Sequence, residues 1–192
     1  MIEQLRYESD LKEEEKDFLL YQTLLHLKNL PYGEKSVVGA SIYDIETQRI
    51  VYANSVSAND ERNDNLWYHA EYMAVKLALE GLINPSKAIV ITTLSPCINE
   101  SSYRAHESCT DILLEAGFRN IHTGMIDRRQ ATLDKYKQLG FDMTVTQDPK
   151  LSKICSELDS FFNEKPSNHL QNFNKQDFLE DILKELPNLG TV

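Results

Sequence analysis

The sequence predicts an α/β fold in three layers, α/β/α, with helices on both faces of a mixed five-stranded sheet. Residues 37–43 and 49–53 are rich in β-branched and aromatic side chains, which is typical of two strands joined by a short turn. Residues 87–146 twice repeat the order strand, helix, strand. Right-handed crossover connections would make the strands of each repeat parallel. A hairpin followed by parallel strands gives a mixed sheet.

The first expected element is a helix that ends near Asn29, before Pro31 and Gly33. Asp10 and Glu13 have the spacing of a capping box, in which each side chain bonds the other residue's backbone amide. The apolar residues that fall roughly on one face of this helix are Leu11, Phe18, Tyr21, Leu24 and Leu25.

After the expected hairpin, residues 54–65 are polar and rich in turn formers, which predicts a loop. A helix is expected over residues 69–80, with Gly81 at its C-terminal cap. Residues 87–94 are apolar and β-rich, and we expect a buried strand there that leads to Pro96 and Cys97.

Ser108 and Asp111 form a second capping-box pattern, which opens a helix that stops at Gly117. The remaining elements of the sheet region are a strand over residues 120–126, a short helix over residues 133–139 and a last strand over residues 141–146.

The character of the chain changes after Pro149, and we divide it into a domain of residues 1–147 and a helical extension of residues 148–192. Residues 151–162 form an amphipathic pattern, and a final helix is expected over residues 178–186. Two roles stay open for this extension. It packs on its own domain, or it contacts a partner or another copy of the chain.

Composition limits the function. The net charge of −10 makes nucleic acid an unlikely partner, because phosphate binding needs Lys and Arg. The sequence holds no apolar run of membrane-spanning length, so no membrane partner is expected. The first residues lack a secretory pattern, which predicts a cytoplasmic protein. Three cysteines do not predict a disulfide framework, and Cys155 is expected to be a buried helix residue.

His69, Glu71, Cys97 and Cys109 have the composition of a hydrolytic zinc site. Three protein ligands leave the fourth zinc position open, which is the catalytic arrangement. We expect His69, Cys97 and Cys109 to bind zinc and Glu71 to move protons. His106 is an alternative to Cys109 as the third ligand.

These residues resemble the cytidine deaminase superfamily, whose zinc-dependent members carry H-x-E followed by P-C-x-x-C. The resemblance covers roughly residues 35–147 and includes the helix-then-glycine segment 111–118. It implies a cytidine-deaminase-like fold and a hydrolytic deaminase. It also implies that Glu71 passes protons from water to a ring nitrogen and a leaving amine, and that the Cys97 amide hydrogen-bonds the ring substituents.

The sequence departs from the family pattern between the two cysteines. Residues 98–108, eleven in all, stand where most members have only a pair. A lengthened spacing resembles the riboflavin-pathway pyrimidine deaminases and some dCMP deaminase relatives. The parallel last strand resembles the dCMP, riboflavin and tRNA-type branches.

Several residues are candidates for binding the substrate. Asn59 and Asn54 compete for the place of the Asn that related enzymes use to bind ribose or base. Aromatic or polar residues before His69 or between the two cysteines could contact a ring or a phosphate, and these are Trp67, Tyr68, Tyr103, Arg104 and His106. The expected function is a zinc-dependent deaminase of a small pyrimidine nucleotide or related aminopyrimidine, acting as a homo-oligomer. The alternatives are a nucleic-acid (tRNA-type) or purine deaminase and a catalytically silent partner subunit.

Overall fold

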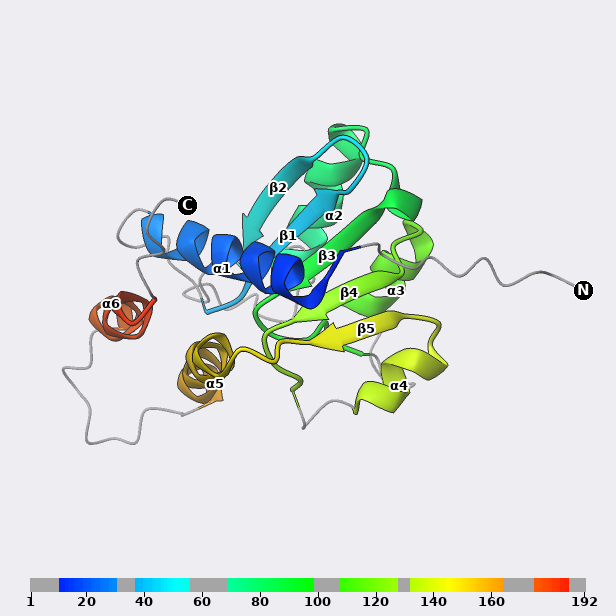
Figure 1. The fold of residues 1–192 in the computed structure, drawn as a ribbon. Helices are drawn as coiled ribbons and strands as arrows, with labels where there is room; N and C mark the ends of the chain where they lie inside the picture. The colour runs from blue at the N-terminus through cyan, green and yellow to red at the C-terminus, as the bar shows by residue number, and fades with distance from the viewer. Residues whose placement is uncertain are drawn as a thin grey trace, which may run out of the picture.

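The computed structural model describes residues 11–30, 37–55, 69–98, 108–127, 132–163 and 175–186. Helices lie on both faces of a central five-stranded sheet, which confirms the predicted α/β/α fold (Figure 1). The strands are β1 (Gly39–Asp44), β2 (Arg49–Asn54), β3 (Ala88–Thr92), β4 (Asn120–Thr123) and β5 (Asp142–Val145).

The strand order is β2-β1-β3-β4-β5, and the sheet is mixed as predicted. β1 pairs antiparallel with β2 and with β3, whereas β3, β4 and β5 are parallel to one another. The carboxyl ends of β3 and β4 therefore meet at one edge of the sheet. The amino end of the antiparallel β1 and the carboxyl end of β2 lie at this same edge.

The six α-helices of the described residues follow the order expected from the sequence. They are α1 (Glu13–Asn29), α2 (Ala70–Glu80), α3 (Cys109–Glu115), α4 (Leu133–Gln138), α5 (Pro149–Asn163) and α6 (Lys175–Lys184). α1 crosses one face of the sheet, and α2 and α3 cover the other (Figure 1). None of the helices within the described ranges is long and apolar enough to cross a membrane.

Alternation along β3 divides the interior into two cores. Val90 belongs to the core beneath α2, α3 and α4, whereas its neighbours Ile89 and Ile91 belong to the core beneath α1. Successive side chains of a strand point to opposite faces, so one buried strand supplies both cores. All three of these side chains are fully buried or nearly so, which suits a strand in the middle of the sheet.

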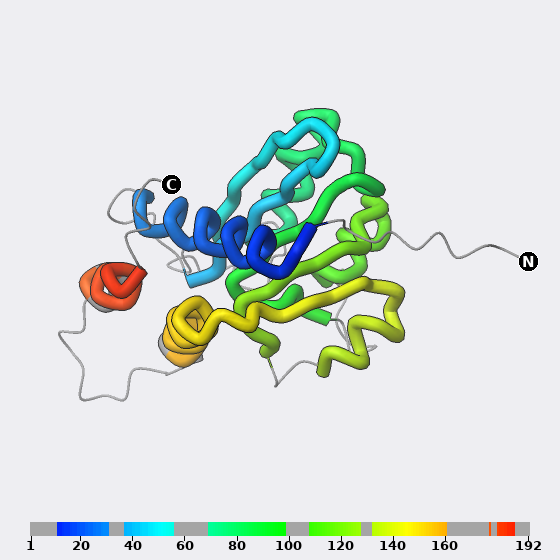
Figure 2. The backbone as a smooth tube through the Cα atoms, viewed as in Figure 1, coloured from blue at the N-terminus to red at the C-terminus, as the bar shows by residue number. Residues whose placement is uncertain are grey.

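The core under α1 also includes α5 and α6. Leu151, Ile154 and Leu158 of α5 and Ile182 and Leu183 of α6 are buried in it together with leucines of α1. The backbone trace shows α5 and α6 beside α1 although they lie far from it in sequence (Figure 2). Of the two roles left open for this extension, packing against its own chain is therefore observed.

The sequence-based prediction for α1 was wrong in two details. The helix begins at Glu13, and the backbone amide of Lys12 donates to Glu15 Oε2 at 2.8 Å, so Glu13 is not the capping partner. Phe18 was expected in the apolar face but is 52% exposed. The buried face includes Leu20, Leu24 and Leu27 instead, because α1 contacts the sheet along this i, i+4, i+7 row.

Gly124, directly after β4, allows α5 to approach the sheet closely. A Cβ atom at this position would lie 2.1 Å from Cys155 Sγ and 2.9 Å from the Thr93 carbonyl oxygen. Cys155 is 1% exposed, which confirms the expectation of a small buried helix residue. Burial raises the pKa of its thiol to about 12. The glycine and the small side chain together permit the contact.

A polar junction fixes α1 to β4 and β5. His122 Nε2 lies 3.0 Å from Asp17 Oδ1, and His122 Nδ1 lies 2.9 Å from Thr144 Oγ1. Thr146 Oγ1 donates to the same Asp17 oxygen at 2.5 Å. The His122 side chain is 0% exposed. Its pKa is lowered, chiefly by burial, although Asp17 and Glu13 on α1 oppose this shift and Lys16 adds to it.

This junction predicts a pH dependence of stability. Because the pKa of His122 in the folded protein lies below its ordinary 6.5, the unfolded chain takes up the proton first. The stabilisation by the neutral ring is complete above the ordinary pKa of 6.5. It is lost as the pH falls from there through the lowered pKa of the folded protein. Between about pH 7 and about pH 5, we expect the free energy of unfolding to fall more for the wild type than for His122→Gln. Urea denaturation at several pH values measures both, and two parallel curves would contradict the prediction.

Candidate metal centre

Three potential metal ligands meet at the sheet edge where β3 ends. His69 is the N-cap residue of α2, and Cys109 is the first residue of α3. Cys97 lies in the segment that follows β3. The strands that precede the two helices, β2 and β3, both end at this edge of the sheet. Positions distant in sequence therefore converge at one point.

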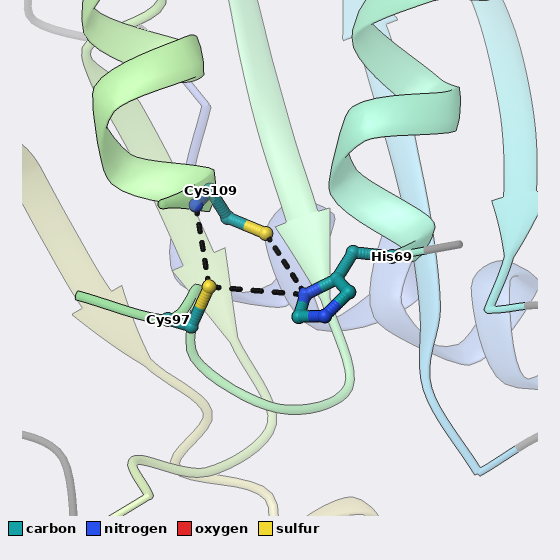
Figure 3. Close-up of side chains that lie close together, drawn as sticks. All are labelled: His69, Cys97 and Cys109. Carbon is teal, nitrogen blue, oxygen red and sulfur yellow. Dashed lines mark hydrogen bonds between the residues drawn. The ribbon is translucent and has the colours of Figure 1, made fainter. Parts of the chain in front are cut away.

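The three donor atoms are close to one another. Cys97 Sγ lies 3.7 Å from His69 Nδ1, and Cys109 Sγ lies 3.3 Å from the same nitrogen (Figure 3). The donor atoms of all three residues fall within 4.8 Å of one another. The three side chains point toward a common centre, as the binding of one shared metal ion would require.

These distances fit zinc. In a tetrahedral site with Zn–S of about 2.3 Å and Zn–N of about 2.05 Å, a sulfur and a nitrogen ligand are about 3.6 Å apart. The two observed sulfur-to-nitrogen distances lie on either side of this value. Two sulfurs and an imidazole select zinc over magnesium or calcium, which prefer oxygen ligands. The three donors would fill three corners of a zinc tetrahedron, and the group has no fourth member among the described residues.

Local capping holds Cys109 in place. The Ser108 hydroxyl accepts from the backbone amide of Asp111 at 3.2 Å, and Asp111 Oδ2 accepts from the backbone amide of Ser108 at 2.8 Å. This is the capping box that the sequence predicts. It fixes the first turn of α3, so the backbone amide of Cys109 donates to Cys97 Sγ at 3.2 Å. An amide at a helix start favours a thiolate there.

The two thiols differ in acidity. The pKa of Cys97 lies well below its ordinary value, because the side chain of Cys109 and then that of His69 hydrogen-bond its sulfur. The pKa of Cys109 is raised, chiefly by burial and then by its hydrogen bond to Cys97. The thiol of Cys97 is therefore the more acidic of the two. A thiolate is the form of cysteine that binds a metal.

Glu71 lies beside the three donors. It is 4% exposed, and the nearby side chain of Cys109 acts to lower its pKa. Burial raises the pKa of its carboxyl to about 7, and the negative charge of Cys97 acts in the same direction. Glu71 follows His69 by a two-residue step in the first turn of α2, where the helix dipole favours a negative charge. A buried carboxyl of this kind can hold or release a proton near neutral pH.

The structure describes few of the expected substrate-binding residues. Asn54 ends β2, at the same sheet edge as the metal centre, but β1 lies between β2 and β3. Its side chain donates to the Ser55 carbonyl at 3.4 Å. The candidates that lie outside the described residues are Asn59, Trp67, Tyr68, Tyr103, Arg104 and His106. Their roles stay predictions.

Sequence reasoning missed the residues that hold Cys97. The Thr110 amide and the Thr110 Oγ1 each donate to the Cys97 carbonyl at 3.2 Å. Tyr136 Oη donates to the Pro96 carbonyl at 2.7 Å. A hydroxyl residue directly after Cys109 could have suggested the first contact. Nothing in the sequence near Tyr136 indicates the second, because the contact joins segments that are forty residues apart.

We predict one zinc ion per chain, bound by His69, Cys97 and Cys109. Cys109→Ala should remove the metal, since it deletes one of three donors, whereas His106→Ala should retain it. Metal analysis of the purified full chain gives the zinc content of both variants. The ligand assignment is wrong if His106→Ala loses zinc and Cys109→Ala keeps it.

Comparison with known proteins agrees with this site. The family model of the cytidine and deoxycytidylate deaminase zinc-binding region matches residues 13–125. No curated protein matches the chain at a significant level. Two solved structures resemble it in fold. One is a diaminohydroxyphosphoribosylaminopyrimidine deaminase/5-amino-6-(5-phosphoribosylamino)uracil reductase from Thermotoga maritima, with 21% identity and a TM-score of 0.54 over 76% of this chain. The other is RibD from Acinetobacter baumannii, with 17% identity and a TM-score of 0.56 over 78% of this chain.

The chain spans only 41% and 39% of the length of those two proteins. At such identities the likeness concerns the fold. The family model is more specific, because the region it matches takes in more than half of the chain and contains His69, Cys97 and Cys109. The chain belongs to the cytidine and deoxycytidylate deaminase zinc-binding family.

Proposed function

We propose that this protein is a zinc-dependent hydrolytic deaminase that releases ammonia from a small pyrimidine nucleotide or a related aminopyrimidine. One observation carries the proposal. A buried carboxyl, Glu71, lies beside a three-donor cluster that fits zinc, and among the described residues this cluster has no fourth member. A structural zinc site uses four protein ligands and has no need of an adjacent carboxyl.

Zinc bound at this centre would supply Lewis acidity and lower the pKa of a water molecule at its open position. Glu71 is placed to accept a proton from the water that attacks the amine-bearing ring carbon. The carboxyl then gives that proton to the adjacent ring nitrogen. It later takes the proton of the hydroxyl added to the ring carbon and passes it to the departing amine, so that the carbonyl forms as ammonia leaves. Water and the amine-bearing ring are consumed, and the carbonyl product and ammonia are formed, so atoms and charge balance.

Other groups of the chain would orient the ring. The backbone amide of Cys97 is the proposed donor to the ring substituents, and Asn54 or Asn59 is the proposed partner of the base or ribose. Burial of the site protects the proton transfers from bulk water. Trp67, Tyr68, Tyr103, Arg104 and His106 are proposed to complete the pocket.

The net charge and the family support a small substrate. A net charge of −10 disfavours a long polyanion such as tRNA or DNA, whose binding depends on many Lys and Arg contacts. The Thermotoga protein of similar fold acts on an aminopyrimidine, which is the chemical class proposed here. A tRNA-type or purine deaminase is the alternative within the family. A catalytically silent subunit is less well supported, because it would not need Glu71.

The wider organisation is proposed on the same grounds. We propose a deaminase domain of residues 1–147 with a helical extension of residues 148–192, in a cytoplasmic homo-oligomer. The family match, which lies wholly before residue 126, supports placing the chemistry in the first part. Size-exclusion chromatography with light scattering on the full chain tests the oligomeric state.

Glu71→Gln and Glu71→Ala should abolish deamination while leaving zinc bound, because Glu71 is not part of the three-donor set. Loss of a positioned acid and base should lower kcat on the order of 10²–10⁴-fold or more. Ammonia release on a panel of aminated bases, nucleosides and nucleotides measures the activity, with zinc content determined in parallel.

Asp44→Asn is the matched control for Glu71. Asp44 is also a buried carboxylate, 3% exposed, but it caps the hairpin at the opposite edge of the sheet by accepting from the Glu46 and Thr47 amides. We expect this variant to keep its activity. Turnover of the Glu71 variants at the wild-type rate would refute the proposed mechanism.

Residues 98–108 should set substrate specificity, because the loop is tied to the metal centre at both ends through Cys97 and Cys109. Arg104→Ala and Tyr103→Ala should raise KM or lower kcat on the best substrate with zinc retained. Steady-state kinetics and metal analysis of both variants test this. Unchanged kcat/KM in both would mean that the insertion is a structural bulge and that specificity comes from residues 54–68.

A further inference from the structure

The turn that carries Cys97 is held by elements outside the metal centre. The Ser95 amide donates to the Met125 carbonyl at 2.9 Å, in the segment that follows β4. The Asp127 amide donates to Ser95 Oγ at 3.0 Å. Tyr136 Oη, on α4, donates to the Pro96 carbonyl at 2.7 Å. The position of Cys97 therefore depends on the segment after β4 and on α4 as well as on α3.

Two hydroxyl contacts hold this turn. The Asp127 amide donates to Ser95 Oγ, and the Tyr136 hydroxyl donates its single proton to the Pro96 carbonyl. Ser95 lies near enough to Tyr136 to lower the pKa of the phenol. Because Ser95 and Pro96 are adjacent residues, the two contacts fix the same short stretch of backbone before Cys97.

The Tyr136 hydroxyl is a constant hydrogen-bond donor to the Pro96 carbonyl, because the phenol stays protonated and its ring is fixed. Its side chain is 0% exposed, and it is among the largest fully buried residues of the described chain. Burial, followed by the nearby negative charges of Cys97, Glu71 and Asp127, raises its pKa well above the ordinary value, whereas Ser95 lowers it. The phenol therefore stays neutral and keeps its proton. The ring is packed in the core beneath α2, α3 and α4, and this packing gives the hydroxyl a constant position.

The Pro96 carbonyl belongs to the same peptide group as the amide of Cys97. Peptide bonds of the described residues are all trans, so this carbonyl and this N–H point in opposite directions. A hydrogen bond that holds the carbonyl against Tyr136 therefore directs the Cys97 amide away from Tyr136. The same bond fixes the start of the Cys97 side chain, because the peptide plane ends at the Cys97 Cα.

We propose that Tyr136 is a positioning residue of the metal centre, which acts through the Pro96–Cys97 peptide to place the Cys97 sulfur and to aim the Cys97 amide at the substrate. This inference rests on the proposed function for the substrate part and on the three-donor centre for the metal part. The proton of the Tyr136 hydroxyl goes to the Pro96 carbonyl and not to one of the three donor atoms. Its effect reaches the site through a single peptide group.

Tyr136→Phe removes only the hydroxyl and tests the proposal in the full chain. Partners that orient a metal ligand typically contribute 10–100-fold to metal affinity, so we expect the zinc dissociation constant to rise about 10–100-fold. Competition with a chromophoric zinc chelator measures this constant. Cobalt in place of zinc should give shifted visible absorption bands, because the bands depend on the placement of the Cys97 thiolate. The kinetic effect should fall on kcat more than on KM.

Tyr21→Phe is the matched control. Tyr21 is a tyrosine of α1 that is 7% exposed and lies in the core on the other face of the sheet. Its variant should leave zinc affinity and the cobalt spectrum unchanged, even if its melting temperature falls. The proposal is overturned if Tyr136→Phe keeps the wild-type zinc affinity and cobalt spectrum, whatever its melting temperature.

A second variant covers a failure of Tyr136→Phe to fold. Ser95→Ala removes the acceptor of the Asp127 amide in the same turn and should weaken zinc binding at least several-fold, and an unchanged zinc affinity would overturn the proposal. The wild type separates this inference from the proposed function. A wild type that binds zinc but deaminates nothing on the panel contradicts the function, while the affinity comparison still decides the role of Tyr136.

Discussion

Four ionisable groups, two of them buried and two half-buried, lie close together after the end of β3, and the geometry of the candidate site depends on this crowding. Cys97, Cys109, His69 and Glu71 would each be better solvated in water, and the raised pKa values of Glu71 and Cys109 show the effect of burial. The fold keeps them together because their backbone positions are fixed at the end of β3 and at the starts of α2 and α3. A divalent cation that prefers sulfur and imidazole ligands would stabilise this arrangement, because its charge would balance the negative charges of the thiolates.

The support for this centre comes from different parts of the chain. The capping box of Ser108 and Asp111 is local and fixes the first turn of α3. The hydrogen bonds of Ser95 and Tyr136 are not local. They connect the turn before Cys97 to α4 and to the segment that follows β4. A ligand set that spans positions 69 to 109 therefore needs the parallel β4 and the helix after it to be in place. The matched family region, residues 13–125, includes β4 but ends before α4.

Much of the fold could be predicted because its signals are local. The alternation of Ile89, Val90 and Ile91 between two cores, the capping box at Ser108 and the glycine after α2 each depend on neighbours in sequence. The metal centre could be predicted because His69, Glu71, Cys97 and Cys109, in that order, form a pattern with few other uses.

Other features escaped prediction because they depend on tertiary contacts. Phe18 and Leu20 both suit an apolar helix face, and only the position of the sheet decides that Leu20 is buried. Tyr136 is one aromatic residue in a short helix, and its partner Pro96 is known only once α4 is docked. The substrate-binding residues stay predictions, since all but Asn54 lie outside the described residues.

The sharing of one core by α1, α5 and α6 bears on the order in which the chain can fold during synthesis. The core beneath α2 and α3 draws on residues between Ala40 and Met143, so it can close before α5 is made. α1 is synthesised early, but the helices that cover it are almost the last described elements. Contacts between such distant segments form slowly because long loops must close first. A nascent chain halted after β5 would hold every candidate ligand yet expose leucines of α1, which makes this helix the first place where a chaperone or an aggregate would bind.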